Sequence, residues 1–71
     1  MRIRRLSVGP DPFKQMHYVV GQKVLDQTFS VNQILKTKEG YDIWVIKDNE
    51  AIRWKSISVS TPVSIEHEID I

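Results

Sequence analysis

The chain contains no cysteine, which excludes disulfide bonds and thiolate metal sites. Its 71 residues include two histidines, too few to favour a structural zinc site. The three glycines, at positions 9, 21 and 40, form no glycine-rich phosphate loop. Small domains without disulfides or bound metals often depend on a partner subunit for stability, because a chain this short buries only about 60% of the surface that its unfolded form exposes. We therefore expect a homo-oligomer.

Long apolar runs and an excess of one charge are also missing. No apolar run approaches the roughly 20 residues that span a bilayer. The basic start, residues 1–5, is not followed by the apolar stretch of a secretory signal. A net charge of +1 gives no general attraction to nucleic acid or acidic membranes. We expect one domain, residues 1–71, located in the cytoplasm without a membrane partner.

Apolar residues recur mainly with a period of two, which is typical of β-strands. Two prolines, Pro10 and Pro12, end the first strand, and Gly21 permits a bend in the second. Residues 13–16 have room for one helical turn, and residues 47–50 are typical of a hairpin turn. The expected strands cover residues 2–8, 17–20 continued after the bend as 23–25, 29–36, 41–46, 51–59 and 63–69. The pattern predicts an all-β fold, either a small barrel or a closed antiparallel meander of five to six strands.

Two of these strands have unusual faces. In residues 51–59, Ile52 and Trp54 share one face, whereas Ile57 and Val59 fall on the other. Such a switch predicts a β-bulge. Strand 41–46 is apolar on both faces, so we expect the 9–16 loop, the opposite wall of the barrel or a second subunit to cover its second face.

The two ends of the chain carry opposite charges. Arg2 and Arg4 share one face of the first strand, and Glu66, Glu68 and Asp70 share one face of the last. If these strands pair, within one chain or between subunits, opposite charges meet across the ladder.

Catalysis is not expected. No serine lies in a nucleophile-elbow context. His67 lies on the opposite strand face from Glu66 and Glu68, so the three residues do not converge on a metal. We interpret His67 as a residue at the end of its strand and predict no metal site and no cofactor.

The segment 9–18 is the first candidate ligand site, because its prolines hold several polar side chains on a stiff loop. These side chains belong to Asp11, Lys14, Gln15, His17 and Tyr18. The alternative is a lid, in which Phe13 and Met16 cover the open end of the barrel while the polar residues are only solvated.

The second candidate is Arg53-Trp54-Lys55, with Trp44 on the adjacent strand. Arg53 and Lys55 are expected on one face, where they could hold an anionic group, and an aromatic ring beside a cation suits a nucleobase with its phosphate. Alternation places Trp54 on the opposite face, however. The simpler interpretation makes Trp54 a core residue and leaves both cations in solvent.

From Tyr18 to Ile57 the chain resembles the SH3-like small barrels. The resemblance starts with Tyr-Val-Val-Gly-Gln-Lys-Val, residues 18–24, and continues through three meander strands. It implies binding of peptides, nucleic acids or other subunits, without choosing among them.

The whole chain also resembles short accessory proteins of tailed phages. The shared features are the Arg-Ile-Arg-Arg-Leu start, the Gly-Pro-Asp segment leading to Met-His-Tyr, and the Pro-Val-Ser-Ile-Glu ending. This resemblance implies a role against host immunity, either by sequestering a nucleotide signal or by blocking a host protein.

Three hypotheses follow. The first is an oligomer that binds a nucleotide-like anion without turning it over, with phosphates held by Lys14, Arg53 and Lys55 and the base or sugar by His17 and Tyr18. The second is an inhibitor or adaptor that binds a host protein through an exposed strand or apolar face. The third is a nucleic-acid-binding module, which the low net charge disfavours.

Overall fold

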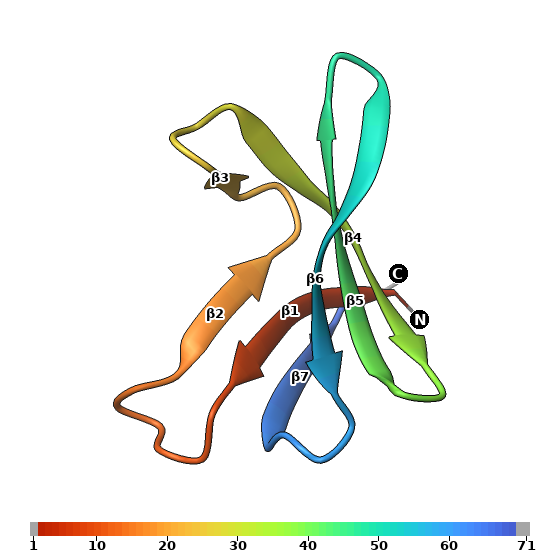
Figure 1. The fold of residues 1–71 in the computed structure, drawn as a ribbon. Helices are drawn as coiled ribbons and strands as arrows, with labels where there is room; N and C mark the ends of the chain where they lie inside the picture. Colours follow the sequence, from red (N-terminus) through yellow and green to blue (C-terminus); the bar gives the residue numbers. More distant parts are fainter. Residues whose placement is uncertain (1, 70–71) are drawn as a thin grey trace.

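The structure is a computed structural model that describes residues 2–69 (Figure 1). In this range the chain forms β-strands and no helix, so the all-β prediction is confirmed. The strands are β1 (Ile3–Val8), β2 (Met16–Val19), β3 (Lys23–Val24), β4 (Phe29–Thr37), β5 (Gly40–Lys47), β6 (Glu50–Ser58) and β7 (Val63–His67). Each lies close to its expected range, and the expected bend separates β2 from β3 at Gly21, where φ is +95°. No helix long and apolar enough to cross a membrane occurs in the described range.

The strands form two antiparallel sheets. One has the order β2-β1-β7 and the other β3-β4-β5-β6. The bend between β2 and β3 connects them, because the Val20 nitrogen donates to the carbonyl of Arg4 in β1 and the Gly21 nitrogen donates to the carbonyl of Val31 in β4. The result is a curled, partly closed barrel, in agreement with the small-barrel prediction.

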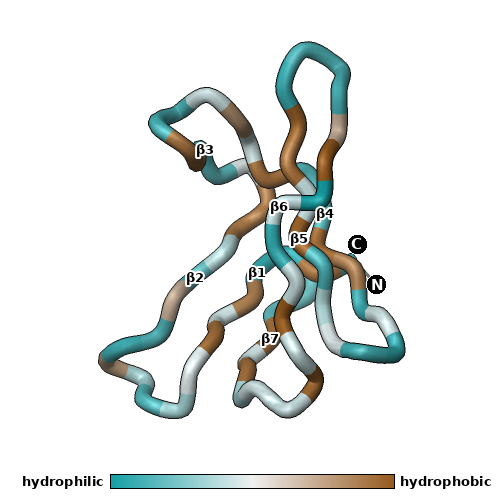
Figure 2. The backbone as a smooth tube through the Cα atoms, viewed as in Figure 1, coloured by the Kyte–Doolittle hydropathy of each residue, from teal (hydrophilic) through white to brown (hydrophobic). Residues whose placement is uncertain are grey.

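The core lies where the two sheets cross (Figure 1). Along β5, Tyr41, Ile43 and Val45 are buried, as the period-two pattern requires. Leu6 of β1 and Ile43 are fully buried. Hydrophobic positions converge at the crossing, whereas the tips of the β4–β5 and β5–β6 hairpins are hydrophilic (Figure 2). The remaining core residues are Ile3, Tyr18, Val31 and Ile34.

The bulge expected in β6 is present at Trp54. Ile43 lies opposite Lys55, and Trp44 lies opposite Arg53, so Trp54 is the extra residue. The second apolar face of β5 is half-buried: Trp44 lies between Gln33 of β4 and Arg53 in the register. Lateral neighbours within the same sheet thus shield this face in part.

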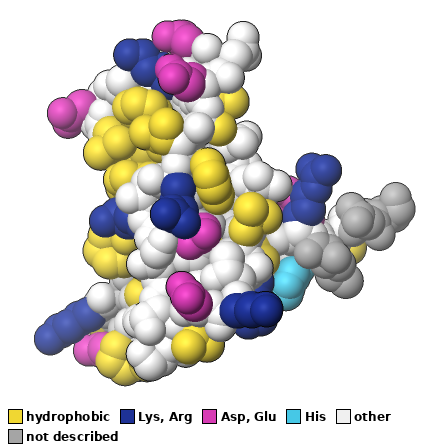
Figure 3. Space-filling model, turned by 45° about the vertical axis from the view of Figure 1, so that its right-hand side comes forward, with side chains coloured by type: hydrophobic (Ala, Val, Ile, Leu, Met, Phe, Trp, Pro, Cys, Tyr) yellow, Lys and Arg dark blue, Asp and Glu magenta, His cyan; other side chains and the backbone are white. Residues whose placement is uncertain are grey.

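The hairpin between β5 and β6 turns at Asp48 and Asn49, as expected, with φ values of 50° and 67°. Left-handed values at both central residues are those of a type I′ turn. In the space-filling view, hydrophobic side chains gather just below this charged tip (Figure 3). Ile52, which is 44% exposed, lies in this part of β6.

The turn between β3 and β4 has an unusual backbone. Leu25, Asp26 and Gln27 all have φ between 54° and 66°, a conformation that costs a non-glycine residue about 1–2 kcal/mol.

We expect Gln27→Gly to increase the free energy of unfolding by up to about 1 kcal/mol. Glycine removes the backbone strain at this position, and the strain removed exceeds the additional conformational entropy that glycine loses on folding. Urea denaturation measures this change. Lys38→Gly is the control, because Lys38 has no left-handed φ, and it should lower stability instead.

The first and last strands pair within the chain, which is one of the two arrangements left open by their opposite charges. β1 runs antiparallel to β7, and Arg4 forms an ion pair with Glu66 at 3.3 Å. The Glu68 nitrogen donates to the Arg2 carbonyl. Asp70, the third acidic residue of the prediction, lies outside the described residues. β7 ends at His67, which agrees with the interpretation of His67 as a strand-end residue but falls short of the expected range of 63–69.

Candidate functional site

The loop between β1 and β2, residues 9–15, is fixed by hydrogen bonds. The Asp11 carboxylate accepts from the Phe13 nitrogen at 2.9 Å, and the Asp11 carbonyl accepts from the Lys14 nitrogen at 2.9 Å. The Gln15 amide donates to the Gly9 carbonyl at 3.0 Å. The helical turn expected at residues 13–16 is not present. Residues 11–14 form a turn closed by the Asp11 side chain and carbonyl, and Met16 begins β2.

The lid interpretation of this loop is wrong. The side chain of Phe13 is 94% exposed and that of Met16 61%, so neither covers the core. The Gly9 nitrogen donates to the Pro62 carbonyl at 2.9 Å, which ties the loop to the turn that carries Val59, another exposed apolar residue. The loop thus presents an apolar tip to solvent.

His17 and Tyr18 point to opposite faces of β2. The His17 Nδ1 lies 2.7 Å from the Ser7 hydroxyl and 3.0 Å from Arg5 Nη2. Because a guanidinium only donates, this Nδ1 is an acceptor and the ring proton is on Nε2. His17 is part of a polar cluster on the outer face of its sheet, away from Tyr18.

Tyr18 and Lys55 meet through Trp54. Tyr18 is a core residue, 7% exposed, and its ring contacts that of Trp54 edge to face, with centroids 5.7 Å apart. The Lys55 Nζ lies 4.9 Å from the centre of the Trp54 ring. Two of the expected site residues, Tyr18 and Lys55, therefore contact the same indole ring, although the Tyr18 ring packs in the core.

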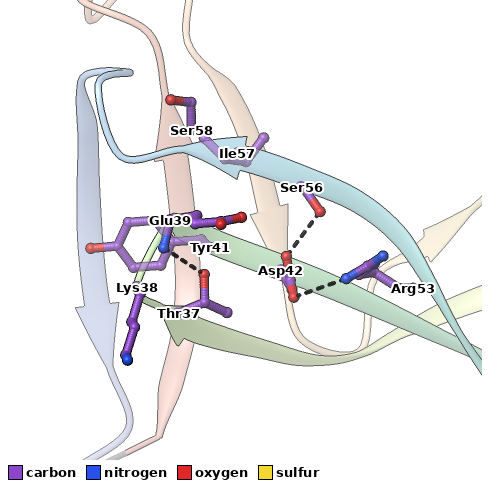
Figure 4. A pocket seen from close by; sticks show the side chains of 9 residues that line it. All are labelled: Thr37, Lys38, Glu39, Tyr41, Asp42, Arg53, Ser56, Ile57 and Ser58. Carbon is purple, nitrogen blue, oxygen red and sulfur yellow. Dashed lines mark hydrogen bonds and ion pairs between the residues drawn. The ribbon is translucent and has the colours of Figure 1, made fainter.

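Arg53 has a different environment (Figure 4). Its Nη1 lies 3.7 Å from a carboxylate oxygen of Asp42, and the Ser56 hydroxyl donates to the same carboxylate at 2.9 Å. The bulge at Trp54 separates Arg53 from Lys55, so the expected pair of cations on one face is not assembled. Arg53 lines an open groove of about 630 Å³, together with Thr37, Lys38, Glu39, Tyr41, Asp42, Ser56, Ile57 and Ser58. The groove has no net charge, because the cations of Lys38 and Arg53 are matched by the carboxylates of Glu39 and Asp42. It therefore has no net electrostatic attraction for an anion.

The pair of Arg53 and Asp42 is expected to add little stability. The Arg53 side chain is 60% exposed and the two groups are 3.7 Å apart; exposed pairs contribute about 0–1 kcal/mol. We expect Arg53→Gln to change the free energy of unfolding by no more than about 0.5 kcal/mol. Urea denaturation in low and high salt measures this change in the free energy of unfolding. A loss above about 0.5 kcal/mol in low salt would show that the Arg53 cation stabilises the Asp42 carboxylate.

A second groove, of about 680 Å³, lies between the sheets, and we call it the inter-sheet groove. Ile3, Ile34 and Tyr41 of the core line it, together with the partly exposed Leu35 and Ile65. Its other lining residues are Arg2, Val20, Asn32, Gln33, Lys36, His67 and Glu68. None of these belongs to the site residues expected from the sequence.

Among the groove residues that the sequence analysis did not name as candidates, only Asp42 could have been recognised from the sequence. Asp42 is the single charged residue within the apolar strand 41–46, and a half-buried carboxylate needs partners, here Ser56 and Arg53. The inter-sheet groove had no signal, since it depends on which strand edges remain unpaired. Within residues 2–69 no group of three or more histidine or acidic side chains is placed to hold a metal ion.

Comparison with known proteins adds no relative. The chain matches no protein-family model, and no curated protein or solved structure matches it. Its function is therefore inferred from its own geometry.

Proposed function

We propose that this protein is a non-catalytic binding protein that docks onto a partner protein through the tip of loop 9–15. The observation that carries this proposal is the 94% exposure of Phe13 on a loop held by hydrogen bonds at Gly9, Asp11 and Gln15. Two further apolar residues are exposed, Met16 at the start of β2 and Val59 in the turn to which Gly9 is hydrogen-bonded.

The energetics favour a protein partner. A phenylalanine side chain offers a large apolar area for burial, and aromatic anchors in the centre of an interface carry much of its affinity. Because Pro10 and Pro12 stiffen the loop and hydrogen bonds at Gly9, Asp11 and Gln15 already fix its shape, little conformational entropy is lost on binding. An exposed phenylalanine contributes little to the stability of the fold. Its place on a preorganised loop is better explained by binding to a partner.

A nearby serine–histidine pair gives no support to catalysis. Ser7 lies 2.7 Å from His17, but Ser7 is only 6% exposed and so is poorly placed to attack a substrate. Arg5 donates to the same His17 nitrogen that would have to accept the serine proton. This geometry supports binding without turnover.

We expect a photo-cross-linking amino acid in place of Phe13 to capture a discrete partner protein in cells that produce this protein. The same amino acid in place of Lys47, at the tip of the opposite hairpin, should give no such product. Phe13→Ser in a purified complex with that partner should weaken affinity about tenfold or more, as loss of a central aromatic does. Leu25→Ser is the matched control, since it removes another exposed apolar side chain and should leave affinity unchanged.

Equal cross-linking from positions 13 and 47, or equal affinity of the two serine variants, would contradict docking through the loop. The folded state of each variant is checked by circular dichroism.

A second candidate function has one observation in its favour. Tyr18, Trp54 and Lys55 are adjacent, and an aromatic ring beside a cation suits a nucleotide. In this proposal an oligomer in the cytoplasm of a phage-infected cell sequesters a nucleotide signal. Native mass spectrometry with cyclic nucleotides and dinucleotides tests this proposal. Lys55→Ala should weaken nucleotide binding about tenfold. If the protein binds none of these nucleotides, this proposal is contradicted and only docking onto a partner protein remains.

A further inference from the structure

One edge of β4 is unpaired over half its length. β3 pairs only with Phe29 and Ser30, and Val31 exchanges two hydrogen bonds with Gly21 and Gln22. After Val31, no described backbone group pairs with β4 on that side. Because ladder groups alternate along a strand, Ile34 and Lys36 direct their backbone N–H and C=O groups to this free edge.

The inter-sheet groove lies along this free edge. Ile34 and Lys36 line it on one side, and Ile3 and Ile65 of the other sheet line it as well. Ile65 and Leu35 remain partly exposed there. Backbone donors and acceptors in a row, beside exposed apolar side chains, are the features by which proteins bind an added strand.

The charges along the groove are biased to positive. Two cations, Arg2 and Lys36, line it, against one carboxylate, that of Glu68. The ion pairs among residues 2–69 are Arg4 with Glu66 and Arg53 with Asp42, so Arg2 and Lys36 have no carboxylate within 4 Å among those residues. The Lys36 Nζ instead lies 5.2 Å from the centre of the Tyr41 ring.

We propose that the inter-sheet groove binds an extended segment of another protein, with alternating apolar and acidic residues, as an added strand on β4. The free backbone groups at Ile34 and Lys36 hold its main chain. Because successive side chains of a strand point to opposite faces, its acidic side chains share the face of Lys36 and its apolar side chains share the face of Leu35.

This site is separate from the loop surface. Val8 leads into loop 9–15, whereas Ile3 lines the groove, and five residues of strand put these ends of β1 about 17 Å apart. With both surfaces occupied, the protein is an adaptor between two partners. The proposal stands without the loop: Phe13→Ser should leave binding in the groove unchanged, so the two can fail independently.

The first test uses a capped peptide, Ser-Ile-Glu-Ile-Asp-Ile-Ser, titrated into the full chain and followed by NMR. We expect shifts at Ile34, Leu35, Lys36 and Ile65. Methylating alternate backbone nitrogens keeps every side chain but removes ladder donors, and should weaken binding about tenfold. A peptide with lysine at both acidic positions should bind about fivefold less tightly, since charge complementarity is lost. Equal binding of the methylated peptide, or shifts centred on loop 9–15, would overturn the proposal.

Charge reversal in the protein is the second test. Lys36→Glu should weaken the acidic peptide and strengthen the lysine peptide, each by about fivefold. Lys47→Glu, at the exposed hairpin tip, is the matched control and should change neither affinity. Arg2→Glu repeats the test in case Lys36→Glu disturbs the Tyr41 contact. If neither reversal changes the preference, or if a second copy of the chain fills the groove in sedimentation experiments, a separate partner is excluded.

Discussion

Gly40→Ala should destabilise the protein by about 3 kcal/mol or more. Gly40 has a φ of +143°, where an alanine is strained, and an added Cβ would overlap the carbonyl oxygen of Ile57 and lie 2.8 Å from the Val59 nitrogen. Backbone strain costs about 1–2 kcal/mol and overpacking about 1–3 kcal/mol. For 71 residues the total stability is of the order of 4–11 kcal/mol, so the loss is a large share. Urea denaturation measures it.

Gly21→Ala is the matched control for this result. Gly21 also has a left-handed φ, +95°, but nothing lies within 4 Å of an added Cβ. It should therefore show the strain of about 1–2 kcal/mol alone. Equal losses for the two variants would show that the close contact of β5 with the end of β6 is not what requires glycine at position 40.

Leu6→Ala is expected to cost about 2–5 kcal/mol. Leu6 is fully buried in the central strand of its sheet, opposite Tyr18 on one side and Ile65 on the other. The substitution removes buried methyl groups and leaves a cavity among neighbours from three strands, which relax only in part. Chemical denaturation measures the loss, and a lower denaturation midpoint with an unchanged slope would attribute it to the folded core.

Leu35→Ala is the control for the same side-chain change. Leu35 is 39% exposed in the inter-sheet groove, so its truncation should cost about 1 kcal/mol or less. If Leu35→Ala proves as costly as Leu6→Ala, the groove is closed in solution, which would also count against its role as a binding site.

Much of the fold was predictable because strand signals are local. Alternation located the strands, and the face switch between Trp54 and Ile57 located the bulge in β6. The charge pattern predicted that Arg4 and the acidic face of the last strand would meet if the chain ends paired, and Arg4 forms an ion pair with Glu66. Glycine at position 21 marked the bend that divides one expected strand into β2 and β3.

The candidate site was less predictable. Side-chain alternation predicted that Arg53 and Lys55 lie on one face. The extra residue at Trp54 instead places Lys55 over the indole ring, while Arg53 forms an ion pair with Asp42. The lid interpretation failed at Phe13 because apolar character alone does not say which residues reach the core. Tyr18 was expected to face a ligand, yet its ring packs against Trp54 in the core.

The sequence by itself determined the all-β class, the positions of the strands and the absence of disulfides, because side-chain alternation, turn residues and composition act over a few neighbours. Only the tertiary structure decided which side chains meet and which backbone edges stay open. The free edge of β4 exists because β3 ends after two residues and β1 pairs in the other sheet. The loop that carries the exposed Phe13 is tied to Pro62 by a hydrogen bond from Gly9. Contacts between distant segments depend on how the sheets cross, which no local pattern specifies.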